Sequence, residues 1–191
     1  MAQAQNKVTF GLSNGHYALA TPGDSGTWTF GTVKSLPNLT SMDASVVGGK
    51  QDVYADNKIV ATMTSYSGQE ITLDLTELSD EFKKEILGYE EDEDGCLCEV
   101  TNAQAKTFAF GCQIEGDQYA RRIWYFLCTA TNPGESSSTK ADSPEANAPQ
   151  ITITARPMAV GEKEVLRKIS KAGDSGYTLF FNTVKIPTFS S

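Results

Sequence analysis

Alternation of apolar and polar residues with a period of two is the feature of this sequence that most constrains its fold. In EITLDLTEL, which begins at Glu70, the apolar Ile71, Leu73 and Leu75 alternate with polar residues. Successive side chains of a β-strand point to opposite faces, so this pattern predicts a strand with one buried face. TFAFGCQI, from Thr107, alternates in the same way, and RRIWYFLCTAT, from Arg121, is apolar on both faces. The second pattern is typical of a strand covered on both sides, and together the segments predict a mainly β chain.

Further segments predict additional strands and hairpins. Asn14-Gly15 is the kind of pair that closes a two-residue β-hairpin, here between Lys7–Leu12 and Tyr17–Thr21. The segment Thr40–Asp56 contains two consecutive glycines between moderately apolar flanks and predicts a long, projecting hairpin. QITITAR, from Gln150, and GYTLFFNTVKI, from Gly176, predict later strands.

One segment has the pattern of a helix, expected near residues 79–87. Ser79 occupies an N-cap position, two acidic residues follow it in the first turn, and Gly88 is placed to end the helix. Leu78, Phe82 and Ile86 recur every four residues and form one apolar stripe. A helix this short is marginal alone, so we expect the stripe to be its docking face on a sheet.

The sequence Gly-Asp-Ser-Gly occurs twice, at Gly23–Gly26 and Gly173–Gly176, and it surrounds the nucleophile of trypsin-like proteases. Ser175 would then need His16 as its base. Tyr177 follows the second copy where the protease motif continues Gly-Pro, and the first copy has no histidine before it at a suitable distance. Both copies therefore favour turns that start strands, and we predict no catalytic residue.

The sequence predicts no metal site and no cofactor site. Its four cysteines lack zinc-site spacing and favour structural thiols. The acidic run Glu90–Asp94 resembles half of a calcium loop, but Thr101 occupies the position that requires a bidentate carboxylate. A solvated acidic turn is the preferred interpretation.

Length and charge restrict the remaining possibilities. A chain of 191 residues suits a single domain, 1–191, with a flexible surface loop at 132–149 and a C-terminal hairpin segment from about residue 161. The formal net charge of -8 argues against a protein that grips phosphate backbones. We expect no membrane partner, because no apolar run reaches the length of a bilayer span, and no secretory signal is visible.

Four stretches give the sequence a specific resemblance. They are NKVTFGLSNGHYALAT, VYADNKIVATMTSYSGQEITLDLTELSDEFKKEILGYEEDEDG, KTFAFGCQIEGDQYARRIWYFLCTATNPG and QITITARPM. In combination they resemble the major tail proteins (tail tube proteins) of long, non-contractile-tailed phages of the siphophage type. The resemblance covers most of the chain and is less distinct from about Gly161.

The resemblance implies two packed antiparallel sheets, a sandwich or barrel, with a flanking helix. It also implies hexameric rings that stack into a tail tube, the conduit for genome delivery, and no enzymatic activity. The implied partners are other copies of the chain and the tape-measure, tail-tip and terminator proteins. Double-stranded DNA would pass the acidic lumen without specific binding. The location would be the virion tail, after synthesis in the bacterial host cytoplasm.

A long hairpin can reach the next ring, so we predict that Ser45–Asp56 makes the ring-to-ring contact. The predicted contact residues are Val46, Val47, Gly48, Gly49, Lys50, Tyr54 and Asp56. Three alternatives stay open from the sequence: a monomeric β-sandwich adhesion module, the inner tube of a contractile particle, and a serine hydrolase.

Overall fold

The computed structural model describes residues 11–55, 58–116, 119–134 and 149–189. Their main feature is a nine-stranded antiparallel sheet with the order β2-β1-β8-β9-β10-β5-β4, in which β3 also pairs with β1 and β13 with β9. These strands are β1 (Leu12–Pro22), β2 (Trp28–Phe30), β3 (Lys34–Ser35), β4 (Leu39–Ala55), β5 (Lys58–Leu75), β8 (Phe108–Ile114), β9 (Arg122–Ala130), β10 (Gln150–Arg156) and β13 (Arg167–Ser170). The predicted mainly β, antiparallel fold class is confirmed.

The remaining elements are short. β6 (Glu90–Glu91) pairs with β7 (Leu97–Cys98), and β11 (Met158–Val160) pairs with β12 (Lys163–Val165). A 3₁₀ turn covers Asp24–Gly26, and helix α1 (Asp80–Phe82) continues into a π-helical turn, Lys83–Leu87.

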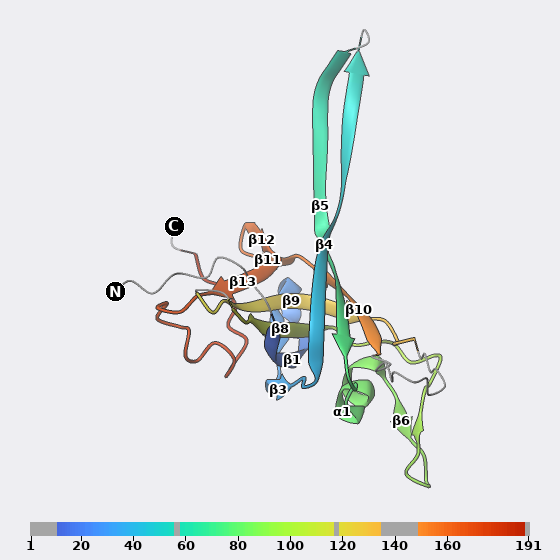
Figure 1. Cartoon of the computed structure of the whole chain (residues 1–191). Coiled ribbons are helices and arrows are strands. Elements are labelled where there is room, and N and C mark those ends of the chain that lie inside the picture. The colour runs from blue at the N-terminus through green and yellow to red at the C-terminus, as the bar shows by residue number, and fades with distance from the viewer. Residues whose placement is uncertain (1–10, 56–57, 117–118, 135–148, 190–191) are drawn as a thin grey trace, which may run out of the picture.

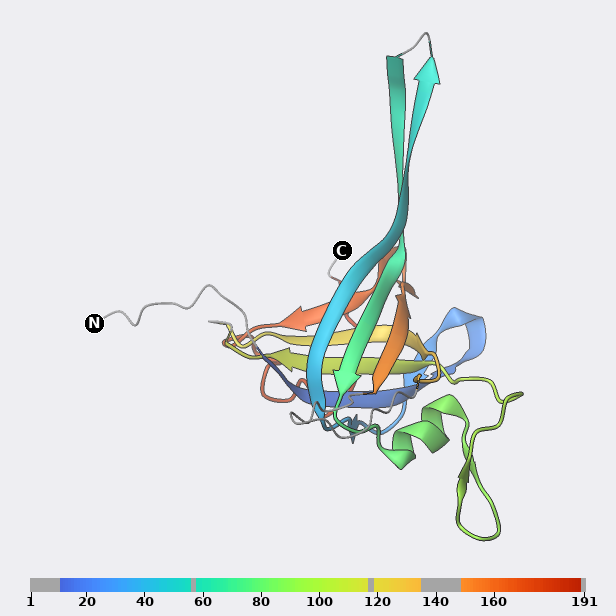
Figure 2. The same cartoon turned by 45° about the vertical axis from the view of Figure 1, so that its right-hand side comes forward.

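The large sheet folds over on itself without closing into a barrel. In Figure 2, β4, β5 and β10 cross in front of β1, β8 and β9, so two parts of one hydrogen-bonded sheet face each other. Between them lies the main core, which contains Tyr17 of β1, Phe110 of β8, Leu73 of β5 and Ile153 of β10. The expected two packed layers therefore come from one continuous sheet.

Strand β9 is covered on both faces, as its sequence predicts. Tyr125 and Cys128 belong to the main core, whereas Trp124 and Phe126 pack in two smaller clusters on the other face. Met158 of β11 contributes to one of these clusters. The second face is thus covered by short elements.

The hairpin predicted at Asn14-Gly15 is wrong. β1 runs straight through these residues, and its pairing with β8 shifts register between Ser13 and His16, which is a bulge that Asn14 accommodates with φ 50°. A Cβ on Gly15 would lie 2.3 Å from the backbone oxygen of Leu36. The glycine therefore permits a close approach of the following segment and does not form a turn. The first predicted arm, Lys7–Leu12, lies almost entirely outside the described residues.

The predicted helix is present but has two geometries. Ser79 caps it, since its Oγ accepts a hydrogen bond from the backbone N–H of Phe82 at 3.4 Å, and Gly88 ends it with φ 81°. The first turn is α-helical and the rest is π-helical. Leu78, Phe82 and Ile86 of the predicted stripe are buried, and Leu87, which the stripe did not include, is buried as well.

The strand predicted over GYTLFFNTVKI is wrong. Residues 176–186, the C-terminal strap, form turns and bends up to Thr183 and irregular structure after it, and they pack on one face of the sheet. Backbone oxygens of the strap accept hydrogen bonds from the sheet: Phe180 O from Trp124 Nε1 at 2.8 Å, and Tyr177 O from Arg122 Nη1 at 2.7 Å. Side chains of the sheet thus satisfy the strap's backbone where a neighbouring strand would otherwise do so.

Candidate assembly interface

The β4–β5 hairpin is the most prominent surface feature of the molecule. β4 leaves the large sheet and extends far beyond the body, and β5 returns beside it from Lys58 at the far end into the sheet, so that the outer parts form an isolated pair (Figure 1). β10 pairs with β5 only from Gln69 to Asp74. From Tyr66 outward, β5 pairs only with β4 among the described strands, so residues 48–66 form a two-stranded ribbon, with residues 56–57 outside the described range.

The long projecting hairpin was expected within Thr40–Asp56, but this segment supplies only one arm. Gly48 and Gly49 lie in the middle of β4, and β5 supplies the second arm. The register shifts between Val47 and Gly48, where a Cβ on Gly48 would lie 2.1 Å from the backbone oxygen of Ser65. The glycines therefore mark the junction between body and ribbon.

The other strand has a matching feature at this junction. Gly68 has φ +148°, and a Cβ there would lie 2.2 Å from the backbone oxygen of Ala155 in β10. Only a residue without a side chain allows β5 to pass β10 this closely.

The residues predicted for ring-to-ring contact all lie on β4, except Asp56, which lies outside the described residues. Val46 and Val47 expose 62% and 41% of their surface, which is unusual for valines in a strand of the large sheet. Gly48 and Gly49 follow at the junction, and Lys50 and Tyr54 belong to the ribbon. Whether these residues contact another ring stays a prediction.

Sequence reasoning missed Tyr66. It pairs with Gly48 across the junction and exposes 52% of its surface, which places a large aromatic residue near the two valines. Its position between Ser65 and Ser67 could have indicated an exposed aromatic, because its neighbours offer no apolar strand face.

The predicted docking face of the helix lies far from this surface, inside the body. Leu78, Phe82 and Ile86 are buried in the main core, where the Phe82 ring makes edge contacts with Tyr17 and Phe108 at centroid distances of 5.0 and 5.5 Å.

An ion-pair cluster fastens the outer side of the helix to β3. Lys34 Nζ lies 2.8 Å from Glu81 Oε1 and 2.9 Å from Glu85 Oε2. Hydrogen bonds to these two carboxylates raise the pKa of Lys34. The helix is therefore held from both sides.

His16 and the turn that contains Ser175 have structural contacts. His16 Nδ1 lies 2.7 Å from the backbone oxygen of Asn14, and its ring stacks on Phe181 with centroids 4.5 Å apart. Asp174 Oδ2 accepts the backbone N–H of Lys171 at 2.9 Å, which is a turn contact. Both Gly-Asp-Ser-Gly copies form turns, as predicted, but only the first leads into a strand, β2.

Candidate metal ligands are not gathered either. Among the described residues, no group of three or more His, Cys, Asp or Glu side chains is placed to hold a metal ion. Burial raises the pKa of the Cys112 and Cys128 thiols to about 12, so both are protonated hydrophobic groups at neutral pH. Cys96 and Cys98 are exposed.

A family model described as phage tail tube protein matches residues 13–185. The chain belongs to the phage tail tube protein family. Its role is therefore structural, in the tail tube of a virion, and the family is not one of enzymes. The ribbon, the two-layered sheet and the helix all lie within the matched residues.

Two further comparisons accompany the family match. A cryo-EM structure of the tube-terminating cap of the anti-feeding prophage is 15% identical; the match covers 82% of this chain and 88% of that chain with a TM-score of 0.47. No curated protein sequence matches this chain. Within its described residues, no helix has the length and apolar character that a membrane span requires.

Proposed function

We propose that this tail tube protein is the subunit of hexameric rings, which stack into the tube that delivers the phage genome. The observation that carries the proposal is the family match over residues 13–185. The subunit acts by assembly, so its functional groups are surfaces and not reactive side chains.

The ribbon supports the assignment of ring-to-ring contact to Ser45–Asp56. The eight residues from Gly48 to Ala55 extend about 25 Å at strand geometry, beyond the part of the sheet that β10 supports. A two-stranded hairpin is marginally stable by itself in water. A partner that packs against the ribbon would stabilise it, and the subunit of the next ring is in a position to do so.

The sheet edges support lateral association. β4 is the last strand of the large sheet, so the edge that does not face β5 carries backbone groups that a neighbouring subunit can pair with. A head-to-tail contact of this kind closes into a ring when its rotation allows, and rings can then stack along one axis.

The net negative charge of the chain supports passage of DNA through the tube without binding. With a net charge of -8, a lumen formed by several copies would repel phosphate groups, so double-stranded DNA would pass without being held. The tape-measure, tail-tip and terminator proteins are the partners proposed for the two ends and the interior of the tube. The subunit is made in the bacterial host cytoplasm and functions in the virion tail.

Negative-stain electron microscopy of the concentrated protein, with light-scattering mass on the same sample, tests this proposal. Hollow tubes or rings with sixfold symmetry are the expected result, with isolated tail tips added as seeds if the protein alone stays monomeric. A protein that stays monomeric even with seeds would instead indicate an adhesion module. Tubes surrounded by a contractile sheath in the virion would indicate a contractile particle.

A further inference from the structure

Two surfaces of the subunit carry opposite charge. The acidic hairpin, residues 88–99, contains six carboxylates and no Lys or Arg. The basic face, residues 163–185, contains five Lys or Arg residues and two carboxylates. In a chain with 24 acidic and 16 basic residues, this separation concentrates positive charge on one segment.

Hydrogen bonds within the acidic hairpin define its conformation. β6 and β7 pair, and Asp92 Oδ1 accepts the backbone N–H groups of Asp94 and Cys96 at 3.0 and 2.7 Å. Glu90, Glu93 and Asp94 are exposed and form no ion pair within the described part of the chain, whereas Glu91 pairs with Lys84. The tip therefore presents a compact set of uncompensated carboxylates.

The basic face contains a groove. The groove has a volume of about 440 Å³ and lies between β13 and the C-terminal strap, with Trp124 and Phe180 in its lining. Lys168 and Lys185 also line it, and Lys168 Nζ donates to the backbone oxygen of Lys185 at 3.3 Å.

The cations of this face have no ion-pair partner in the part of the chain that the structure describes. No ion pair among the described residues includes Lys163, Arg167, Lys168, Lys171 or Lys185. The one carboxylate that lines the groove, Asp174, already accepts hydrogen bonds from Ser170 Oγ and the Lys171 N–H. Asp174 supplies one negative charge against the two lysines that line the groove, so the lining keeps a net positive charge.

The two surfaces lie on opposite sides of the body. In Figures 1 and 2, β6 and β7 lie at one end, β13 and the strap lie at the other, and the ribbon projects in a third direction. Acidic and basic surfaces on opposite sides of one chain suit a head-to-tail contact, in which two different, complementary surfaces of identical copies meet.

We propose that the acidic hairpin of one subunit docks on the basic face of the next subunit within a ring, at the groove that Lys168 and Lys185 line. This inference rests on the proposed function and specifies its lateral contact. The ribbon then makes the contact between rings, and the charge pair acts together with the β4 sheet edge in the contact around each ring. Opposite charges speed encounter and select the correct orientation, because the alternative pairings bring like charges together.

Charge reversal provides the test. One variant carries Glu90→Lys and Glu93→Lys, and a second carries Lys168→Glu and Lys185→Glu. Each alone places like charges at every lateral contact and is expected to raise the concentration needed for assembly by about tenfold or more. A variant with Asp24→Lys and Glu77→Lys changes the net charge equally outside the acidic hairpin and is expected to assemble like the wild type.

Mixing the two variants gives the decisive result. In a ring with an even number of subunits, the variants can alternate, and every contact then pairs opposite charges again. Equimolar mixtures are expected to recover assembly, which light scattering and electron microscopy measure. A cooperative urea unfolding transition first establishes that each variant is folded.

Each outcome has a distinct meaning. If each variant assembles normally, or if the mixture fails to recover, the charge contact is wrong while the tube function stands. If the wild type itself never forms rings, with or without tail-tip seeds, the proposed function is wrong.

Discussion

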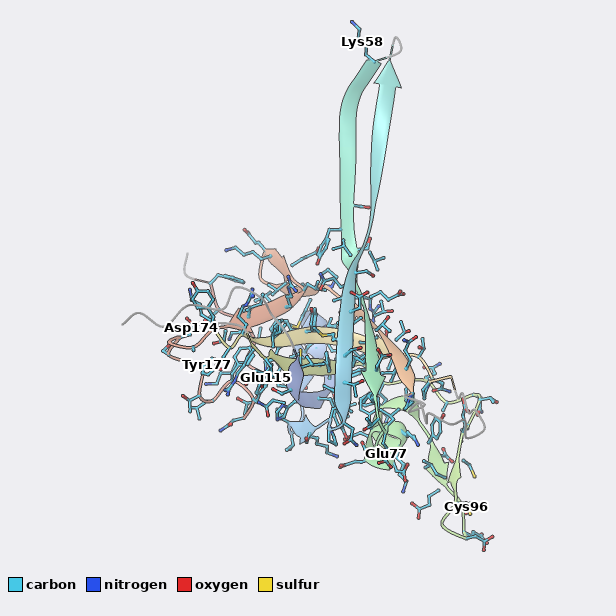
Figure 3. All side chains as sticks on the ribbon, viewed as in Figure 1. Lys58, Glu77, Cys96, Glu115, Asp174 and Tyr177 are labelled. Carbon is cyan, nitrogen blue, oxygen red and sulfur yellow. The ribbon has the colours of Figure 1, made fainter. Side chains whose placement is uncertain are left out.

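The two halves of strand β5 have very different surroundings. From Gln69 to Leu75 the strand lies between β4 and β10, and Ile71, Leu73 and Leu75 are fully buried. From Lys58 to Tyr66 the same strand has only β4 beside it and projects from the body (Figure 3). One strand thus belongs both to a packed core and to a ribbon without one.

This difference indicates that the stability of the fold and the assembly of subunits depend on different parts of the molecule. Burial of apolar side chains is the dominant stabilising term in folding, and the body contains the three apolar clusters formed by the described residues. The body should therefore fold without the ribbon, while the ribbon should matter mainly for contact between subunits. Substitutions in the two regions should affect different measurements.

Phe82→Ala should have the largest effect on the body. It removes a fully buried ring that packs against Tyr17 and Phe108, and the expected loss of unfolding free energy is about 3–5 kcal/mol. Urea unfolding followed by tryptophan fluorescence measures it. Phe82→Leu is the matched control and should cost clearly less; equal losses would show that the helix does not depend on this packing.

Gly68→Ala tests the junction. The new methyl group would lie 2.2 Å from the Ala155 backbone oxygen at φ +148°, so we expect a loss of about 1–3 kcal/mol. Gly49→Ala is the control, because its Cβ would meet only the Ser65 hydroxyl at 3.4 Å. Similar unfolding midpoints for the two variants would contradict the close passage of β5 over β10.

Ser79→Ala should have a smaller effect on the body. The hydroxyl satisfies the Phe82 N–H at the helix start, and its loss should cost about 1 kcal/mol in urea unfolding. Ser79→Asp keeps an acceptor at the cap and should remain close to the wild type. A loss as large with Asp as with Ala would argue against capping.

The pH dependence at His16 should be the smallest effect. Burial lowers the pKa of His16, a hydrogen bond with Asn14 O opposes this, and the charge of Arg122 lowers the pKa further. The unfolded chain therefore binds the proton more readily, so this contribution to stability is complete above about pH 6.5. It should be lost as the pH falls through the folded-state pKa.

The measurement is unfolding free energy against pH, with the single imidazole followed by NMR. His16→Phe can keep the ring stack on Phe181 without titrating, and its profile should lack this component. A folded-state imidazole pKa at or above about 6.5 would contradict the sign of the effect.

Much of the body was predictable from local patterns. The alternation around Ile71 and the two-faced apolar run at β9 predict their own burial, because the period of a strand fixes which residues share a face. Ser79 and Gly88 predict the ends of the helix for a similar reason, since capping is local.

The errors concern residues whose role depends on distant contacts. Asn14-Gly15 has the composition of a hairpin turn, yet Gly15 is required by Leu36 and Leu39, which pack against its backbone. Gly48 likewise allows the Ser65 backbone of β5 to lie close to β4. The strap is apolar enough for a strand, but hydrogen bonds from Arg122 and Trp124 hold it in turns. Such contacts leave no local pattern.

Of the candidate interface, Val46 and Val47 were predicted because apolar residues beside glycines stand out in a polar stretch. Tyr66 and the groove beside β13 were not, because both arise only when the chain folds.

Replacing the ribbon residues Lys50–Thr64 with Asn-Gly tests the central claim most directly. Gly49 and Ser65 are paired, so a two-residue turn can join them and leave the body intact. We expect urea unfolding of the body to change by less than about 1 kcal/mol, while tubes disappear from electron micrographs taken beside the wild type. A folded variant that still builds tubes of normal length and yield would contradict the account.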